Sequence, residues 1–307
     1  MSDARRPDFF IVGAPKCGTT AMAKYLGAHP QIFMPVAKEL HYFGEDLDYR
    51  RRRPTSDEYL AAFNAAGSAR RVGEASVGYL YSDRAPAEIL EFSPGADILI
   101  MLRDPIEMIQ SQHAQELFMG QEEITDLESA LAAEPERAAG RQIPVGCTAP
   151  YLLRYTWIAR YADHVERYLE AFGRDHVHVT LFDDFRSNTA AAYADVVKFL
   201  GCDPAFAPEF PIVNRRKSAR SARLQRIVRD PPAIIRSAAR RLLPLGARVR
   251  ARNALYRLNT AAAAGSPMSD ELRARLRAEL APDVARLADL IGSDLSAWLP
   301  APASRQP

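Results

Sequence analysis

Asp8-Phe-Phe-Ile-Val-Gly13-Ala-Pro-Lys16-Cys-Gly18-Thr19-Thr20-Ala-Met-Ala-Lys-Tyr-Leu26 is the stretch that decides the fold of this 307-residue chain. An apolar run that ends at Gly13 predicts a strand, and the apolar spacing from Thr19 to Leu26 predicts a helix. A glycine-containing loop between them directs backbone N–H groups and the helix N-terminus toward an anion. We therefore expect a phosphate-binding loop, in which Lys16 adds a positive charge and Thr19 and Thr20 add hydroxyls and an N-cap.

Two further apolar runs predict a larger sheet around this unit. The run 96–102 leads into Arg103-Asp104-Pro105, where the proline suits the first turn of a helix that extends to about residue 117. The run 177–182 follows a long helical stretch over 151–172 and precedes another helix over 189–200. This alternation predicts an α/β fold, P-loop-like and three-layered, with a central, mostly parallel sheet. Ligands are then expected at the carboxyl ends of the strands.

The overall composition is that of a globular protein. Hydrophobic residues make up 48% and charged residues 25% of the chain. The longest aliphatic run, over 98–102, is far below the ~20 residues that span a bilayer. The first ten residues lack the apolar stretch of a secretory signal, so we expect a cytoplasmic protein. The three cysteines, Cys17, Cys147 and Cys202, are expected to be reduced thiols.

The composition changes beyond Asn214. Between residues 215 and 257, fourteen Lys and Arg residues face one acid, Asp230, although the whole chain carries a net charge of only +2. We expect the strands to stop here and a helical C-terminal extension, residues 221–307, to pack on the α/β domain of residues 1–220. A final helical pair over 269–291 is expected to break at Pro282.

The basic amphipathic pattern of residues 234–243 leaves three interpretations open. It fits a helix packed on the core through its apolar side, an interfacial helix that binds anionic lipid, or a nucleic-acid contact. The last is disfavoured because interleaved aromatic residues are lacking. The second would bring segment 215–257 to the inner membrane face as a peripheral contact.

The phosphate loop differs from that of nucleoside triphosphatases. In those proteins Lys directly follows the second glycine, and the next Ser or Thr holds magnesium. Here Lys16 precedes Gly18 by two positions, and no residue is reserved for a metal. The segment Pro15-Lys16-Cys17-Gly18-Thr19-Thr20 resembles instead the P-K-x-G-T-[TS] loop of sulfotransferases, which binds the 5′-phosphosulfate of 3′-phosphoadenosine 5′-phosphosulfate (PAPS).

A second segment is similar to the part of this family that binds the 3′-phosphate of the nucleotide. The family has an arginine at a strand end and a serine eight residues later, which match Arg103 and Ser111. Arginine binds phosphate bidentately and a serine hydroxyl adds a directional donor. The alternatives are that Asp104 is a Walker-B-like magnesium ligand or that Arg103 and Asp104 form a strand-end ion pair.

The segment 214–221 resembles the late basic loop with which family members cover the nucleotide. The resemblance implies that Lys217 and Arg220 lie near the 3′-phosphate. A solvated basic surface is the alternative interpretation of the same charges.

The segment Lys38-Glu39-Leu-His41-Tyr42-Phe43 resembles the K-E-x-H-[FY]-F segment of Golgi-type carbohydrate sulfotransferases and bacterial relatives. The resemblance implies that Glu39 is the base that takes the proton of the acceptor, with His41 as its rival. It also implies that Lys16 stabilises the charge on the departing 5′-phosphate.

A further segment, Gly73-Glu74-Ala75-Ser76-Val77-Gly-Tyr79, is similar to the family pattern E-x-[ST]-P-x-Y. Val77 replaces the common proline, and Ala75 stands where heparan-type enzymes have lysine, so the acceptor stays open. The candidate acceptor contacts are Tyr42, Tyr79 and Tyr81.

The resemblance covers residues 7–220 and implies a PAPS-dependent O-sulfotransferase that requires no metal. Its acceptor would be a hydroxyl of a small molecule, a carbohydrate or a glycolipid, and nucleic acid is not an expected partner. Two alternatives stay open at this point. An ATP- or GTP-dependent phosphotransferase of the P-loop class would require Mg²⁺ and Asp104. A non-catalytic nucleotide-binding relative would not require Glu39.

Overall fold

The computed structural model describes residues 5–211, 217–219, 260–262 and 268–300. The chain forms two compact units. The first comprises residues 1–108, 156–213 and 270–307, and the second comprises residues 109–155 and 214–269. The expected boundary at residue 220 stays a prediction, because residues 220–259 lie outside the described part of the chain.

The first unit is built on a five-stranded sheet in which all neighbouring strands are parallel. The strand order is β2-β3-β1-β4-β5. The strands are β1 (Phe9–Gly13), β2 (Ile32–Phe33), β3 (Arg71–Ala75), β4 (Asp97–Leu102) and β5 (Val177–Leu181). β1 is buried along its whole length, as expected for a parallel strand covered on both faces. The predicted α/β fold and its three apolar strands are therefore confirmed.

Strands β2 and β3 were not predicted, and the charges in β3 explain why. Arg71 and Glu74 interrupt the apolar run in Arg71-Val-Gly-Glu-Ala75. In the structure Arg71 Nε pairs with Asp8 Oδ1 at 2.6 Å, and Arg71 Nη2 pairs with Asp97 Oδ2 at 2.7 Å. These ion pairs compensate the charge at the amino end of the sheet, so the strand forms despite its polar sequence.

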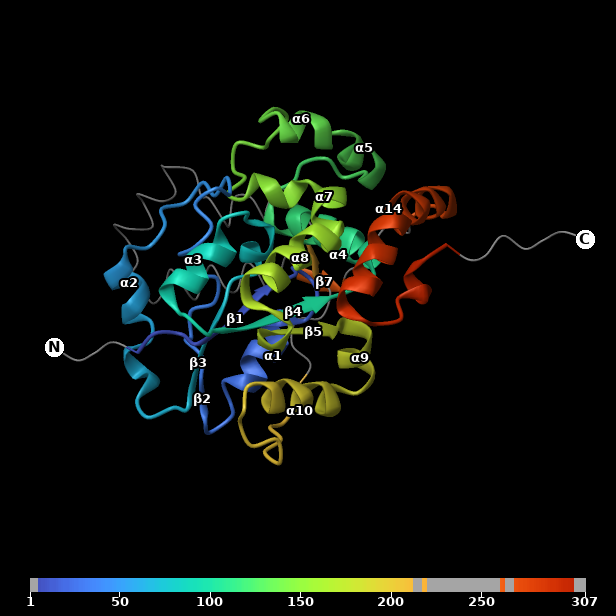
Figure 1. The fold of residues 1–307 in the computed structure, drawn as a ribbon. Coiled ribbons are helices and arrows are strands. Elements are labelled where there is room, and N and C mark those ends of the chain that lie inside the picture. The colour runs from blue at the N-terminus through green and yellow to red at the C-terminus, as the bar shows by residue number, and fades with distance from the viewer. Residues whose placement is uncertain (1–4, 212–216, 220–259, 263–267, 301–307) are drawn as a thin grey trace, which may run out of the picture. The chain divides into compact units, whose positions relative to one another are not determined.

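Helices cover both faces of this sheet (Figure 1). On one face α1 (Thr19–Leu26) packs with α10 (Thr189–Phe199), and on the other α3 (Ala85–Phe92) packs with α8 (Tyr161–Phe172). The C-terminal helix α14 (Asp270–Ile291) packs on α8. The predicted three-layer arrangement is thus confirmed. The remaining short elements of this unit are α2 (Ser56–Ala61), η1 (Asn64–Ala66), η2 (Val77–Tyr81), η4 (Arg174–His176), α9 (Phe182–Ser187) and η5 (Ser296–Trp298).

Two helix predictions were wrong in detail. The stretch 151–172 is divided into the 3-10 turn η3 (Pro150–Leu153), α7 (Tyr155–Ala159) and α8, with non-helical backbone at Arg154 and Arg160. Conversely, α14 continues through Pro282 without a break. Leu280, Val284 and Leu287 are buried on both sides of this proline, and their packing outweighs the lost backbone hydrogen bond.

The second unit contains most of α4 (Pro105–Met119), together with α5 (Leu127–Ala132), α6 (Glu134–Ala138) and η3. Its buried centre is the carboxylate of Glu122, which pairs with Arg137 at 2.7 Å and accepts a 2.8 Å hydrogen bond from the Tyr155 hydroxyl. Strands β6 (Lys217–Ala219) and β7 (Thr260–Ala262) pair antiparallel, so the expectation of no strands beyond Asn214 was wrong.

The expected basic amphipathic helix over 234–243 lies outside the described residues, so its three interpretations stay open. Among the helices that the structure describes, none combines the length and the apolar character needed to cross a membrane.

Candidate functional site

The loop between β1 and α1 lies at the carboxyl edge of the sheet, where the strand order switches direction. From β1 the chain builds β2 and β3 on one side and then β4 and β5 on the other. The crevice at such a switch point is the usual ligand site of open α/β sheets. The backbone N–H of Ala14 donates to the carbonyl of Met101 at 2.7 Å, which ties the loop to the end of β4.

Gly18 is the N-cap of α1 and shapes the loop. Its φ of 90° lies in the left-handed region, and a Cβ there would approach the ring of Phe185 to 3.1 Å and that of Phe182 to 3.2 Å. The cap makes no side-chain hydrogen bond, so the expected capping by Thr19 or Thr20 was wrong. The first turn therefore receives no side-chain acceptor from the cap, and its Ala21 N–H is bonded only to the Gly18 carbonyl, which suits an anion-binding helix start.

Cys17 is a structural part of this loop. Its side chain is fully buried, and its thiol donates to the carbonyl of Pro15 at 3.3 Å. Burial raises the pKa of the Cys17 thiol to about 12, so it is protonated at neutral pH and is not a nucleophile. Gly18 and Cys17 therefore shape the loop, the first through its backbone conformation and the second through its packing.

Arg103 lies where the ends of β1, β4 and β5 meet. Its guanidinium lies 4.7 Å from the ring centroid of Phe182, the residue that also borders Gly18. Arg103 Nε donates to Glu107 Oε2 at 3.1 Å, a contact on one turn of α4. Arg103 is thus close to the phosphate loop and paired with the carboxylate of Glu107.

For the other three predicted nucleotide contacts, the structure gives at most the element in which the residue lies. Ser111 is buried on α4 and belongs to the second unit. Lys217 lies in β6, and Arg220 lies outside the described residues. The participation of Ser111, Lys217 and Arg220 in nucleotide binding stays a prediction.

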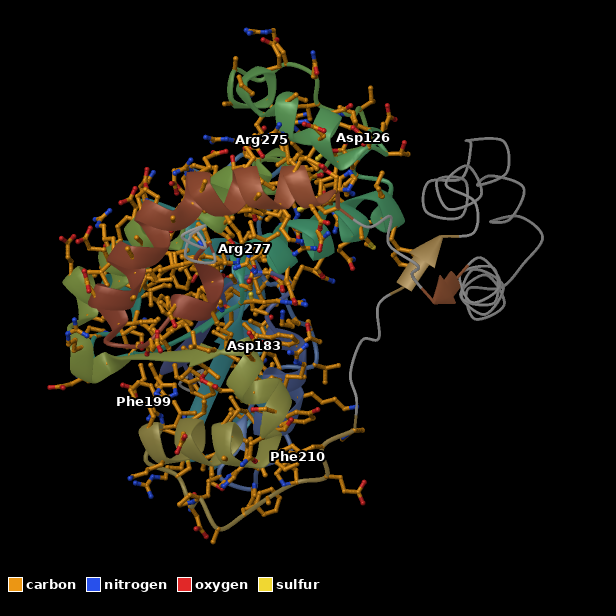
Figure 2. All side chains as sticks on the ribbon, turned by 90° about the vertical axis from the view of Figure 1, so that its right-hand side faces the viewer. Asp126, Asp183, Phe199, Phe210, Arg275 and Arg277 are labelled. Atoms are coloured by element: carbon orange, nitrogen blue, oxygen red, sulfur yellow. The ribbon has the colours of Figure 1, made fainter. Side chains whose placement is uncertain are left out.

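Asp104 has a structural role in this protein. Its Oδ1 accepts hydrogen bonds from the N–H groups of Ile106 at 2.8 Å and Glu107 at 3.2 Å, and its Oδ2 accepts from Arg277 at 3.1 Å. Figure 2 shows Arg277 on the C-terminal helix α14. Burial raises the pKa of Asp104. Both carboxylate oxygens are therefore used, one to begin α4 and the other to anchor α14.

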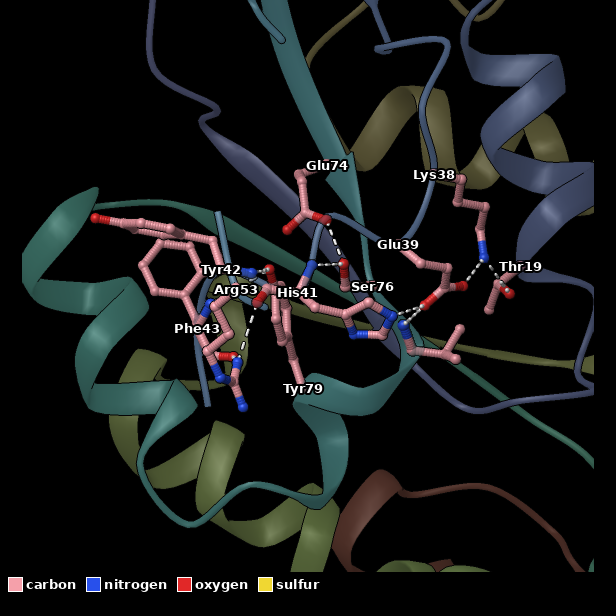
Figure 3. Close-up of polar contacts among 11 residues, drawn as sticks. Thr19, Lys38, Glu39, His41, Tyr42, Phe43, Arg53, Glu74, Ser76 and Tyr79 are labelled. Carbon is pink, nitrogen blue, oxygen red and sulfur yellow. Dashed lines mark hydrogen bonds and ion pairs between the residues drawn. The ribbon is translucent and has the colours of Figure 1, made fainter. Parts of the chain in front are cut away.

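The Lys38-Glu39-Leu-His41 segment lies against the carboxyl end of β3, and Figure 3 shows its polar contacts. The backbone N–H of Glu39 donates to Ala75 O at 3.0 Å, and Glu39 Oε2 accepts from the N–H of Val77 at 3.0 Å. Glu39 Oε1 pairs with Lys38 Nζ, which lies 3.5 Å from Thr19 Oγ1. The candidate base and the phosphate loop are thus joined by one lysine side chain.

The three candidate catalytic residues share an unusual backbone conformation. Lys16 has a φ of 65°, Glu39 of 66° and His41 of 51°, and among the described residues only Gln142 is another non-glycine with positive φ. Such conformations cost energy and cluster at functional sites. The sequence carried no signal of this feature, because no glycine marks these positions.

Side chains from other segments hold this strained stretch in place. Arg53 donates to His41 O at 3.0 Å and to Phe43 O at 2.7 Å. The hydroxyl of Ser76 accepts from the N–H of His41 at 3.2 Å and donates to Glu74 Oε1 at 2.6 Å. Sequence reasoning missed Arg53, which lies within a run of four arginines and is not distinguished from its neighbours by type.

The imidazole of His41 is neutral at pH 7. Burial lowers its pKa, and the nearby charges of Arg53, Arg51 and Lys38 act in the same direction against the opposing charge of Glu39. Its Nε2 lies 3.8 Å from Glu39 Oε2, and its ring packs on Tyr49 with centroids 4.3 Å apart. Since the imidazole is neutral, we interpret the contact with Glu39 as a polar contact and not as an ion pair.

The three candidate acceptor tyrosines are packed within the first unit. Tyr79 and Tyr81 are each 1% exposed. The Tyr79 hydroxyl accepts from the N–H of Tyr42 at 2.9 Å, and the Tyr42 ring stacks on Tyr59 with centroids 4.3 Å apart. Tyr79 therefore supports the segment that carries Glu39, and direct contact of the three tyrosines with an acceptor stays a prediction.

A phosphate loop at the switch point, an arginine at the next strand end and a carboxylate joined to the loop through Lys38 are the features of a group-transfer enzyme of the α/β class. Residues 6–216 match the family described as the sulfotransferase domain. The chain belongs to this family, whose membership implies PAPS as the sulfuryl donor.

Known proteins similar to this chain include one solved bacterial enzyme and two curated mammalian proteins. The structure of a sulfotransferase from Alicyclobacillus acidocaldarius has a TM-score of 0.72 and 31% identity, covering 96% of this chain and 99% of that one. Carbohydrate sulfotransferase 15 of Rattus norvegicus is 23% identical over an alignment of 269 residues, which covers 71% of this chain and 47% of that protein.

The second curated relative is bifunctional heparan sulfate N-deacetylase/N-sulfotransferase 3 of Mus musculus. It is 28% identical over an alignment of 217 residues, which covers 66% of this chain and 23% of that protein. The chain thus spans less than half the length of these two curated relatives.

Proposed function

We propose that this protein is a PAPS-dependent O-sulfotransferase. The observation that carries the proposal is the Glu39 carboxylate, which is anchored on Val77 N–H and joined through Lys38 to Thr19 of the phosphate loop. Sulfuryl transfer resembles phosphoryl transfer, in which positioning and charge stabilisation supply most of the catalysis. A base beside an anion-binding loop is the arrangement that this reaction requires.

The phosphate loop and Arg103 would hold the donor, which supplies the sulfuryl group when it is bound. A Cβ at Gly18 would lie 3.1 Å from the Phe185 ring and 3.2 Å from the Phe182 ring, so a glycine suits this turn, whose backbone N–H groups are the donors that would hold a phosphate group. Lys16 would stabilise the charge that develops on the departing 5′-phosphate, aided by the hydroxyls of Thr19 and Thr20. Arg103 would exchange Glu107 for the 3′-phosphate, which it can bind bidentately.

Glu39 would act as the general base, and His41 would orient it. The Glu39 carboxylate is fixed through both oxygens, whereas the neutral His41 ring packs on Tyr49 and lies 3.8 Å from Glu39. A base must lie within hydrogen-bond reach of the proton that it removes. Because Glu39 is the group joined to the phosphate loop, we assign the proton of the acceptor hydroxyl to its carboxylate.

The acceptor would be a hydroxyl of a carbohydrate, a small molecule or a glycolipid. The name of the rat relative refers to carbohydrate sulfotransfer, which favours the first class. A lipid acceptor would agree with peripheral membrane contact through segment 215–257, which lies mostly outside the described residues. Independence of metal is also part of the proposal. The described residues hold no group of three or more His, Cys, Asp or Glu suited to a metal ion.

A thermal-shift comparison tests the donor assignment. Adenosine 3′,5′-bisphosphate is added in the presence of EDTA, and ATP and GTP are added with Mg²⁺. A ligand at 100 times its dissociation constant stabilises the native state by ~2.7 kcal/mol, so we expect a clear shift with the bisphosphate alone. A shift only with a triphosphate and Mg²⁺ would overturn the proposal and favour the P-loop phosphotransferase.

A further inference from the structure

Lys38 makes a contact that its position next to Glu39 does not by itself explain. Adjacent residues of an extended chain point to opposite sides, but the positive φ of Glu39 departs from that geometry. Both side chains turn toward the same place (Figure 3), where Lys38 Nζ meets Glu39 Oε1 and lies 3.5 Å from Thr19 Oγ1. The ammonium group therefore lies between the candidate base and the start of α1.

The start of a helix is an unfavourable place for a positive charge. The N-terminal end of α1 carries a partial positive charge, and Lys16 already lies in the loop before it. No acidic residue occurs in the first turn of α1. The Lys38 side chain is 21% exposed, and the carboxylate of Glu39 is the anion that compensates it. An ammonium group has three N–H donors, so a second anion at the loop would share it with Glu39.

We propose, on the basis of the proposed function, that Lys38 is the second cation of the reaction centre, binding a sulfonate oxygen of the donor and orienting Glu39. The acceptor oxygen forms a bond to sulfur while the bond from sulfur to the bridging phosphate oxygen breaks. That electron pair stays on the 5′-phosphate, and the acceptor proton passes to Glu39. The products are a sulfate ester and adenosine 3′,5′-bisphosphate, and Lys38 remains protonated throughout.

This role predicts that loss of Lys38 changes the affinities of two ligands differently, because the ligands differ at one group. Adenosine 3′,5′-bisphosphate has both phosphates of the donor but lacks the sulfonate, so it does not present the group that Lys38 would bind. A hydrogen bond to a charged group contributes enough binding energy to change an affinity by about 10- to 100-fold. Loss of the ammonium should therefore weaken PAPS binding and leave bisphosphate binding unchanged.

Isothermal titration calorimetry of both ligands on the full chain tests the inference. In Lys38→Met we expect the affinity for PAPS relative to the bisphosphate to fall about 10- to 100-fold. The matched control is Lys24→Met, because Lys24 is an exposed lysine on α1. Lys38→Arg keeps the charge and should retain the wild-type ratio within about threefold.

The outcomes distinguish this inference from the proposed function. Wild-type protein that binds neither ligand would overturn the sulfotransferase proposal itself. Wild-type binding of both ligands with an unchanged ratio in Lys38→Met would overturn only the role of Lys38. An equal loss of affinity for both ligands would also overturn the role of Lys38, because Lys38 would then support the whole loop and not bind the sulfonate. Bisphosphate binding by each variant also reports that its loop is folded.

Discussion

The proposed donor loop, residues 13–20, and the proposed acceptor segment, residues 38–43, are built in opposite ways. The loop over 13–20 is fixed by regular elements, since it connects β1 to α1 and is held by backbone bonds and packing. Residues 38–43 lie in no helix or strand. Their conformation depends on the side chain of Arg53, from the loop before α2, and on those of Ser76 and Tyr79, from the turn at η2.

The loop and the segment, the two halves of the site, should therefore tolerate substitutions differently. A site made from backbone N–H groups and a helix start accepts many side-chain changes, provided that the glycine conformation is kept. A segment held by side-chain hydrogen bonds changes shape when any of its supports is replaced. We therefore expect mutations in the two halves to separate donor binding from transfer.

The largest expected effect is that of Glu39→Gln. The amide cannot take the acceptor proton, so we expect kcat to fall about 10²- to 10⁴-fold. Binding of adenosine 3′,5′-bisphosphate should be unchanged, because the donor loop is intact. The measurement is transfer of radiolabelled sulfate to a hydroxyl acceptor found by screening, with exposed Glu45→Gln as the control. Equal turnover of wild type and Glu39→Gln would exclude Glu39 as the base.

Lys16→Ala should impair both donor binding and transfer. We expect weaker binding of adenosine 3′,5′-bisphosphate and a loss of about 10²- to 10³-fold in kcat, because one stabilising charge at the leaving phosphate is removed. Calorimetry and the same transfer assay measure the two effects, and Lys24→Ala is the control on α1. Unaltered bisphosphate binding would place Lys16 outside the donor site.

Glu74→Gln probes the buried support of the acceptor segment. Burial raises the pKa of Glu74 to about 7 from an ordinary value of 4.5. Between pH 4.5 and about pH 7, Glu74 is ionised in the unfolded chain but keeps its proton in the folded protein, so the free energy of unfolding falls as pH rises toward 7. The total loss is roughly 3 kcal/mol.

Urea denaturation at pH 5 and pH 8 measures this dependence. The amide does not titrate, and its oxygen can still accept the hydrogen bond from Ser76. Glu74→Gln should therefore lose less stability than the wild type between the two pH values. An identical pH dependence in both proteins would show that Glu74 is ionised across the range.

The smallest expected effect is that of Arg53→Lys. Lysine keeps the charge but lacks the planar fork that donates to the carbonyls of His41 and Phe43. At about 1 kcal/mol for each of the two lost hydrogen bonds, we expect kcat/KM for the acceptor to fall about 30-fold. Donor binding should not change, and Arg52→Lys on the exposed surface is the control. A parallel loss of bisphosphate affinity would show that the two halves are coupled.

The local sequence predicted much of the donor half. The bounds of α1 and the apolar strands β1, β4 and β5 followed from continuous patterns. Strands β2 and β3 escaped detection because one has two residues and the other carries charges that are paired only in the folded protein. The Pro282 prediction failed for a related reason, since the packing of α14 on α8 overrides a local helix breaker.

The sequence by itself determined the phosphate loop, the strand-end arginine and the sulfotransferase resemblance, because these depend on short spacings that are read locally. The tertiary structure decided where the ends of three strands meet, and it brought Arg53 and Ser76 to residues 38–43. It also decided that Asp104 anchors Arg277 and that Lys38 joins Glu39 to Thr19. Such contacts are set by the packing of distant segments, and the strained backbone at Glu39 and His41 persists only because those segments hold it.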